Sequence, residues 1–499
     1  MKKVLVVGGG MGGLFTGALL AKEGIEVTVL EKNARIGGGL QTFCRRGEWY
    51  ETGMHLVGGF QEGGPLDGLC RYLGIRDRLQ LEPTDQTARV RIGNDEYLLP
   101  RGLEAFRQYL SGRFPDQTEG LARYVDALNR LYDEEPLLRL EPAGTDFPEH
   151  SAEFWMPADA FIAQYVTDGR LRSLLAFINP LYAGEAGCSP AFLHAIISRL
   201  FIEGSFRLRD SAALAEALKS VIEAGGGRVL AGRKVTALEV QDKAVVAARA
   251  VDAGGCETLY PAEAFVSDIH PCSLLSLVDE GVFPRPFARR LREIPNTGSV
   301  FKVFIKFRPG CMPYVNHPVY LLDRYQDVWR QGTYEASCWP CGLSCFMSPD
   351  AGRPGRASHM VVLAQMPFEV VKPWEDTLSG RRGEDYARWK QLHTERVLDK
   401  VAELFPHIGE SIEDVFAASP LTFRDWYGTA QGSMYGYRKD CEHPALSRLA
   451  IRTKLGNLFL TGQNVNMHGI GGVPMTALET AEALVGKNVI INKINHITI

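Results

Sequence analysis

The sequence has few of the features that mark specialised classes of protein. After residue 22 it holds no stretch of about 18 apolar residues without a charge, so it predicts no membrane-spanning helix. It holds no run of five or more like charges, and its formal net charge of −4 argues against a nucleic-acid partner. No internal repeat or low-complexity segment occurs. We therefore expect a small-molecule partner, while peripheral contact with a membrane through a few apolar residues stays open.

Cysteine is sparse. Ten cysteines are spread over 499 positions, which fits reduced thiols in a cytoplasmic protein better than a disulfide framework. One cluster, Cys338, Cys341 and Cys345, contains a C-x-x-C pair that resembles a redox dithiol. A redox dithiol is expected at a helix start after a strand, and an iron–sulfur site needs a fourth ligand. The sequence shows neither context, so we predict three structural thiols and no metal site.

The opening residues imitate a secretory signal peptide, because a basic start precedes eighteen uncharged residues. Six glycines interrupt that stretch. The short β-branched run 3–7 leads into Gly8, Gly10 and Gly13, spaced as G-x-G-x-x-G before a helical pattern. Such glycines allow a tight turn, close approach of a pyrophosphate to the helix N-terminus, and close packing of helix on strand. The motif therefore predicts a dinucleotide site rather than a signal peptide.

Two further signals narrow the choice of dinucleotide. Glu31 directly follows the next strand-like run, 26–30, about 20 residues after the glycines, where a carboxylate can accept hydrogen bonds from ribose hydroxyls. An acid at this position disfavours the 2′-phosphate of NADP. A second glycine cluster follows and contains Arg35, Gly37, Gly38 and Thr42. Its R-x-G-G-x-x-x-T arrangement resembles the second dinucleotide motif of flavoproteins of the amine oxidase and phytoene desaturase superfamily, which implies FAD.

Two later segments supply further parts of a nucleotide-binding domain. Residues 212–223 have helical apolar spacing, and after a glycine stop 228–240 reads as strand, turn and strand. Near the end, 458–461 reads as a short buried strand, and a glycine-rich stretch leads to Pro474. We expect Pro474 at the first position of a helix, whose N-terminus would be a second place for anionic oxygens of the cofactor.

The remaining sequence falls into two stretches of different character. The first holds helix-type patterns, including 121–138 and 192–201, and the second holds mostly strands, including 299–307, 343–347 and 359–366. We predict an α/β fold in which a Rossmann-type FAD-binding domain is interleaved with an α+β substrate-binding or cap domain. The FAD-binding domain would comprise residues 1–75, 205–285 and 440–499, and the cap domain 76–204 and 286–439. Pockets are often formed where two such domains meet.

The opening motifs, Gly53-Met54-His55, the GSMYG segment at 432–436 and the LTGQ segment at 460–463 together resemble the bacterial phytoene desaturase-like family. Within it the chain is most similar to carotenoid cis–trans isomerases and all-trans-retinol 13,14-reductases. The resemblance implies FAD, a two-domain fold and an extended apolar polyene as substrate. It implies cofactor contacts at Gly8, Gly10, Gly13, Glu31, Arg35, Gly37, Gly38, Thr42, Val235, Gly462, Gln463, Gly471, Gly472 and Val473. Gln463 stands where many relatives carry an acid.

The expected chemistry needs a proton as well as a hydride. A flavin passes hydride through one ring nitrogen, so the protein must place a substrate carbon there and handle a proton nearby. His55 is the first candidate for that proton, because histidine titrates near neutral pH, and His468 and Tyr435 are the others. Each of the three can instead be a structural residue that shapes the pocket. We predict saturation or cis–trans isomerisation of a carbon–carbon double bond, with desaturation as the reverse hydride flow.

Two alternatives stay open. An amine oxidase-type flavoprotein shares both opening motifs and would take hydride from a carbon beside nitrogen. A non-catalytic flavin-holding component of a polyene pathway would use the cofactor for structure alone. Only one G-x-G-x-x-G occurs and no separate nicotinamide domain is evident, so the electron donor is unassigned, with NADH and NADPH as candidates. The oligomeric state is likewise open.

Overall fold

Strand β1 (Lys3–Val7), helix α1 (Met11–Lys22) and strand β2 (Glu26–Leu30) form the unit that the first glycine motif predicts. They belong to a computed structural model that describes residues 2–142 and 149–497. The two strands pair in parallel and have the predicted bounds. Most of their side chains are buried, as expected for a parallel sheet that helices cover.

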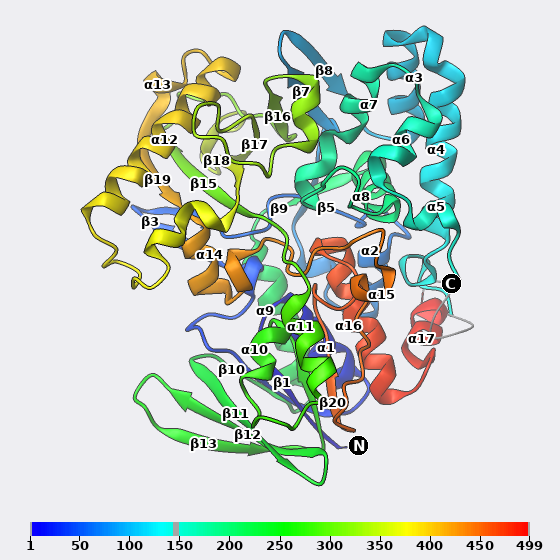
Figure 1. Ribbon diagram of the computed structural model, residues 1–499, viewed down its shortest axis with the longest axis vertical. Coiled ribbons are helices and arrows are strands. Elements are labelled where there is room, and N and C mark those ends of the chain that lie inside the picture. Colours follow the sequence, from blue (N-terminus) through cyan, green and yellow to red (C-terminus); the bar gives the residue numbers. More distant parts are fainter. Residues whose placement is uncertain (1, 143–148, 498–499) are drawn as a thin grey trace.

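Five parallel strands form the central sheet in the lower half of Figure 1. Their order is β10-β2-β1-β14-β20, with β10 (Arg228–Leu230), β14 (Ala264–Ser267) and β20 (Leu458–Leu460). Helix α1 packs between α9 (Ser211–Ala224) and α16 (Gly469–Val485). An antiparallel sheet of β11 (Arg233–Gln241), β12 (Ala244–Asp252) and β13 (Glu257–Pro261) lies below. Strands from three separated parts of the chain thus meet in one sheet.

A seven-stranded sheet extends from the upper left to the top centre of Figure 1, in the order β19-β15-β18-β17-β16-β7-β8. Only the β16–β7 pair is parallel among these described strands. The strands are β7 (Ala88–Ile92), β8 (Asp95–Leu99), β15 (Ser299–Phe307), β16 (Val319–Leu322), β17 (Gly342–Pro349), β18 (Ala357–Met366) and β19 (Ile412–Ala418). The apolar side of α12 (Glu384–Leu404) shares a core with this sheet.

Helices form the upper right of Figure 1, which agrees with the helix-type patterns there. They are α3 (Leu103–Arg113), α4 (Thr118–Asp133), α5 (Ala152–Trp155), α6 (Ala158–Tyr165), α7 (Gly169–Leu175) and α8 (Ala191–Glu203). The predicted helix 121–138 was too long, because Pro136 starts a separate 3₁₀ turn and cannot continue α4. Strands β7 and β8 were missed, although the Gly93-Asn94 loop between them is a hairpin signal.

Smaller elements join these layers. Strands β5 (Val57–Gly58), β9 (Ser205–Leu208) and β6 (Leu81–Pro83) form a three-stranded sheet, and β3 (Thr42–Arg45) pairs with β4 (Glu48–Glu51). The other helices are α2 (Pro65–Leu73), α10 (Pro271–Leu275), α11 (Arg285–Glu293), α13 (Ile408–Ser411), α14 (Pro420–Tyr427), α15 (Pro444–Ser447) and α17 (Val489–Ile497). The boundaries of the two predicted domains stay a prediction.

The predicted helix start at Pro474 was wrong. Helix α16 begins at Gly469, so Pro474 lies inside it. Proline has no N–H, so the carbonyl group four residues earlier, at Ile470, loses its partner within the helix. Gly469, Ile470 and Val473 line the pocket described below, so the first turn of α16 faces that pocket.

All ten cysteines are free thiols. Cys345 lies in β17 with its side chain in the core, and burial raises the pKa of its thiol to about 12. In the parts of the chain that the structure describes, no three histidine, cysteine or acidic residues are grouped so that they could hold a metal ion. Across residues 2–142 and 149–497, no helix has both the length and the apolar character needed to cross a bilayer.

Candidate functional site

The glycine-rich turn after β1 opens the N-terminus of α1 toward a pocket. Gly8 has a φ of 104°, which favours glycine, and Gly10 precedes α1 without a side chain to cap it. A Cβ at Gly13 would lie 2.1 Å from the carbonyl oxygen of Gly8, so only glycine lets helix and strand approach this closely. The first turn of α1 contains no acidic residue. Backbone N–H groups and the positive end of the helix dipole are therefore available to an anion.

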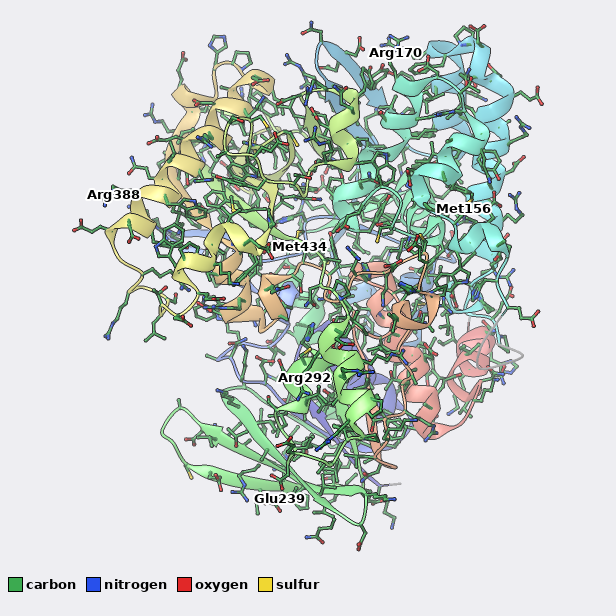
Figure 2. The ribbon with its side chains drawn as sticks, viewed as in Figure 1. Met156, Arg170, Glu239, Arg292, Arg388 and Met434 are labelled. Carbon is green, nitrogen blue, oxygen red and sulfur yellow. The ribbon has the colours of Figure 1, made fainter. Side chains whose placement is uncertain are left out.

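The pocket lies at the carboxyl edge of the parallel sheet, where α/β folds place their ligands. It has a volume of about 460 Å³. Its walls come from the ends of β1, β2 and β14, from the start of β11, and from 426–429. Met434, which also lines the pocket, lies where the upper layers meet the lower sheet (Figure 2). The pocket thus sits between the parallel sheet and the rest of the molecule.

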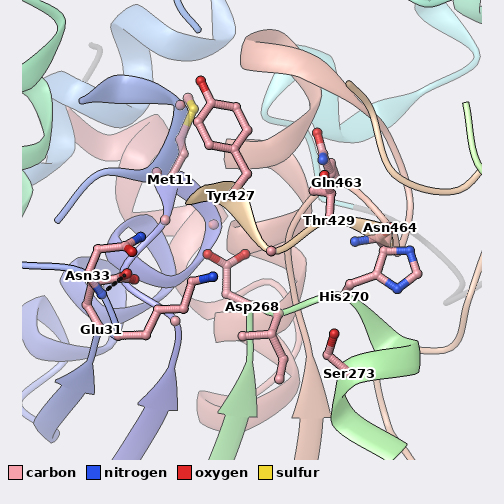
Figure 3. Close-up of a pocket in the computed structure, with 18 of the residues that line it drawn as sticks. Met11, Glu31, Asn33, Asp268, His270, Ser273, Tyr427, Thr429, Gln463 and Asn464 are labelled. Atoms are coloured by element: carbon pink, nitrogen blue, oxygen red, sulfur yellow. Dashed lines mark hydrogen bonds between the residues drawn. The ribbon is translucent and has the colours of Figure 1, made fainter. Parts of the chain in front are cut away.

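Glu31 occupies the place that the sequence predicts, at the end of β2 on the pocket wall. Its carboxylate accepts hydrogen bonds from the backbone N–H groups of Gly9 and Asn33, each at 2.8 Å. Figure 3 shows the contact with Asn33 as a dashed line. These two bonds fix the carboxylate beside the glycine turn, so it can receive further hydrogen bonds from a ribose.

The predicted cofactor residues divide into two groups. Those that line the pocket are Gly8, Gly10, Glu31, Gly38, Val235, Gln463 and Val473. The lining does not include Gly13, Arg35, Gly37, Thr42, Gly462, Gly471 or Gly472. Several residues of this second group make contacts that keep the backbone of the pocket walls in place. Their roles as cofactor contacts stay predictions.

Residues of the second group have visible structural tasks. The N–H of Gly37 donates to the carbonyl of Gly9 at 2.7 Å and joins the two glycine clusters. Arg35 donates to the carbonyl of Thr42 at 3.2 Å and lies over the ring of Trp49. A Cβ at Gly472 would lie 2.4 Å from the Cβ of Met467, so that glycine permits close packing of α16.

Asp268 and His270 follow β14 and line the pocket, and neither is among the site residues that the sequence predicts. Figure 3 shows Asp268 in the middle of the pocket, between Glu31 on one side and His270 on the other. Recognition of 264–267 as a buried parallel strand would have placed both residues at the same sheet edge as Glu31. His270 is a helix cap, because its Nδ1 accepts from the N–H of Cys272 at 3.2 Å.

A cluster of buried charged side chains lies next to the pocket. Lys302, on β15, donates from Nζ to the carbonyl of Thr52 at 2.6 Å and to Nε2 of His55 at 3.3 Å. The neighbouring Gly53 and Met54 line the pocket, so this segment connects the cluster to the pocket wall. The ring of His55 stacks on Phe346 with 4.9 Å between centroids. Lys302 was not among the predicted site residues.

Burial sets the protonation of this cluster. It lowers the pKa of Lys302 to about 7, although the charge of Glu51 opposes the shift. Burial, together with the charge of Lys302, holds the pKa of His55 well below its ordinary value. Burial would raise the pKa of Glu51, but its ion pair with His359, whose Nε2 lies 3.5 Å from the carboxylate, lowers it to about 2. At neutral pH His55 is therefore neutral, and Lys302 is the group poised to gain or lose a proton.

His468 and Tyr435 contact each other rather than the Lys302 cluster. Their rings stack with 5.7 Å between centroids, and the Tyr435 hydroxyl donates to the carbonyl of Pro180 at 3.1 Å. Tyr435 lines the pocket. Neither ring nitrogen of the buried His468 has a hydrogen-bond partner among the described residues. Burial and the charge of Lys439 lower the pKa of His468 well below its ordinary value, so it too is neutral.

Comparison with known proteins relates the whole chain to flavoproteins. The family model described as flavin containing amine oxidoreductase matches residues 11–485. All-trans-retinol 13,14-reductase of Homo sapiens is 25% identical over an alignment of 532 positions, which covers 97% of this chain and 86% of that protein. Hydroxyneurosporene desaturase of Cereibacter sphaeroides is 25% identical over 521 residues, which cover 96% of each. A solved oxidoreductase from Methanosarcina mazei shares the fold, with a TM-score of 0.65, 15% identity, and coverage of 96% of this chain and 100% of that one.

Proposed function

The chain belongs to the flavin-containing amine oxidoreductase family, and from this we propose that it uses FAD to act on a carbon–carbon double bond of an apolar polyene or isoprenoid. Membership of the family identifies a flavin oxidoreductase. The full-length likeness to proteins named for retinol and for a carotenoid supports the choice of substrate. The proposed reaction is saturation or cis–trans isomerisation.

The residues of the pocket suit FAD. The uncapped N-terminus of α1 can receive a pyrophosphate, and Glu31 is held where it can accept from ribose hydroxyls. At Gly12 a Cβ would lie 2.8 Å from the Cα of Gly462, so the two glycine segments form a narrow cradle that a larger residue would close. FAD bound here would supply hydride transfer.

The buried Lys302–His55 pair is the observation that carries the proposed chemistry. Saturation adds hydride to one alkene carbon and a proton to its neighbour. An ammonium group with a pKa of about 7 is a suitable proton donor at neutral pH. His55 accepts a hydrogen bond from Lys302 and so orients it. This arrangement favours Lys302 as the proton donor, whereas the sequence favoured His55.

An anaerobic flavin spectrum tests the proposal. The purified protein would be reduced with NADH, NADPH or dithionite and then mixed with all-trans-retinol or a cis-carotenoid. Reoxidation of the flavin by the polyene, with a blue-shifted product, would establish saturation, and isomer change without net reoxidation would establish isomerisation. Peroxide release from amines, with no reaction of polyenes, would refute the proposal in favour of an amine oxidase.

His55→Ala should reduce turnover about 10- to 100-fold while FAD stays bound, because Lys302 loses the ring that orients it. The measurement is kcat together with flavin content from the 450 nm absorbance. His317→Ala is a matched control, since His317 contacts Asp85 on another part of the molecule. Unchanged kcat in His55→Ala would remove His55 from the mechanism.

We also propose peripheral contact with a membrane near the pocket. Trp426 lines the pocket, yet 56% of its surface is exposed, which suits a side chain that inserts among lipid headgroups. Trp426→Ala should weaken sedimentation of the protein with phosphatidylcholine vesicles. Failure of the unaltered protein to sediment with vesicles would refute this contact.

A further inference from the structure

Asp268 places a carboxylate at the glycine turn where the pyrophosphate of FAD would bind. A Cβ at Gly12 or at Gly462 would lie 2.3 Å from Oδ1 of Asp268, and a Cβ at Gly10 would lie 2.8 Å from Oδ2. The glycines of both segments therefore make room for this carboxyl group as well as for a cofactor. Asp268 lines the pocket and projects into its middle (Figure 3).

We propose that Asp268 binds FAD as a neutral carboxylic acid, so that binding of the cofactor takes up a proton. The inference rests on the proposed use of FAD. An ionised carboxylate beside the N-terminus of α1 would compete with the pyrophosphate for the same N–H groups and would repel its negative charge. A protonated carboxyl group can instead donate a hydrogen bond to a phosphate oxygen.

The charged groups around Asp268 come from several elements. Glu31 at the end of β2 adds a second negative charge. Lys32 follows Glu31, and Arg233 and Lys234 come from β11 on the pocket wall. His270 lies two residues further along, and burial lowers its pKa, so it is neutral above pH 7. Among the described residues that line the pocket, the remainder are uncharged near neutral pH.

The surroundings of Asp268 already favour the neutral form. Enclosure by protein raises the pKa of its carboxyl group to about 7, and Glu31 contributes in the same direction. A hydrogen bond from the backbone of Gly13 opposes the shift. A pyrophosphate nearby would raise this pKa further. Below pH 7 the carboxyl group of Asp268 thus already holds the proton. Above pH 7 it must take up a proton when FAD binds.

This gives a defined dependence of affinity on pH. A group whose pKa rises on binding weakens that binding as the pH climbs above the pKa of the free protein. The dissociation constant for FAD should therefore rise by about tenfold per pH unit above pH 7, the slope for one proton. Riboflavin, which has no pyrophosphate, should show no such rise.

The experiment measures FAD release from the purified full-length protein by flavin fluorescence at pH 6–9. Calorimetric rebinding at pH 8 in two buffers of different ionisation enthalpy should show uptake of about one proton. Asp268→Asn should bind FAD with an affinity that does not change from pH 6 to pH 9, because the amide donates a hydrogen bond but does not ionise. Asp279→Asn, an exposed position, is the matched control and should keep the slope.

Each outcome decides the matter. A pH-independent affinity of the unaltered protein would overturn the inference. The same slope in Asp268→Asn would also overturn it, because the titration would then belong to Lys32, the pKa of which is lowered by burial. If Asp268→Asn fails to fold, Lys32→Met decides: proton uptake that persists in this variant supports the inference, and loss of the uptake would overturn it. Absence of FAD binding at every pH would instead overturn the proposed function itself.

Discussion

Lys302→Met should lower polyene turnover by about 10²- to 10⁴-fold while the protein keeps its flavin. The methionine side chain is of similar length but has no ionisable proton, so the alkene carbon that must be protonated loses its proton donor. Reduction of the flavin by dithionite needs no protein acid and should proceed as before. Stopped-flow measurement of the two half-reactions therefore separates loss of the proton from loss of the cofactor.

The rate of flavin reoxidation should depend on pH in a defined direction. Saturation uses the protonated ammonium group, so the rate of flavin reoxidation should fall as pH rises through about 7, the pKa of Lys302. The residual rate of Lys302→Met should be flat over that range. Lys306→Met is the matched control, because Lys306 lies on the same strand but pairs with Glu413 near the surface. Full turnover in Lys302→Met would show that the proton comes from elsewhere.

Gly12→Ala should yield a protein that purifies without flavin. The new Cβ would lie 2.3 Å from Oδ1 of Asp268 and 2.8 Å from the Cα of Gly462. The second contact is with backbone, which cannot swing away, so α1 and the turn after β20 must separate. Overpacking of this kind destabilises a fold by about 1–3 kcal/mol. The cradle for the cofactor would be distorted as well.

Absorbance at 450 nm and thermal unfolding measure both effects of Gly12→Ala. Gly112→Ala is the control, because Gly112 also lies in a helix and a Cβ there meets nothing within 4 Å. It should retain flavin and unfold at the same temperature or slightly higher, since alanine favours helix. A flavin-loaded Gly12→Ala protein would mean that the two glycine segments can move apart without loss of the site.

The sequence was most informative where local patterns determine the structure. The runs 3–7, 26–30 and 299–307 became strands with those bounds, because alternation or continuous apolar character identifies a buried strand. Gly8 and Gly13 have the backbone conformation or close contact that their spacing predicts. The family resemblance was likewise confirmed across residues 11–485.

Lys302 shows what the sequence could not supply. In β15 it shares a face with Lys306, and the charge of a lysine side chain by itself assigns both residues to solvent. Only 2% of Lys302 is exposed, because the segment around Thr52 and His55 covers it. Its pKa and its proposed role arise from that covering segment, which lies some 250 residues away in the sequence. Asp268 was missed for a similar reason, because its place depends on which strand ends meet.

The strand order of the parallel sheet has a consequence for the way the protein is made. Strands β1 and β2 are synthesised first, but β14 can join β1 only after more than half the chain has been synthesised, and β20 follows nearly 200 residues later. Such long-range pairing slows folding. Until β20 and α16 arrive, α1 has an uncovered apolar side that invites aggregation. A ribosome-bound chain should therefore need protection at α1, and flavin can be captured only at the end of synthesis.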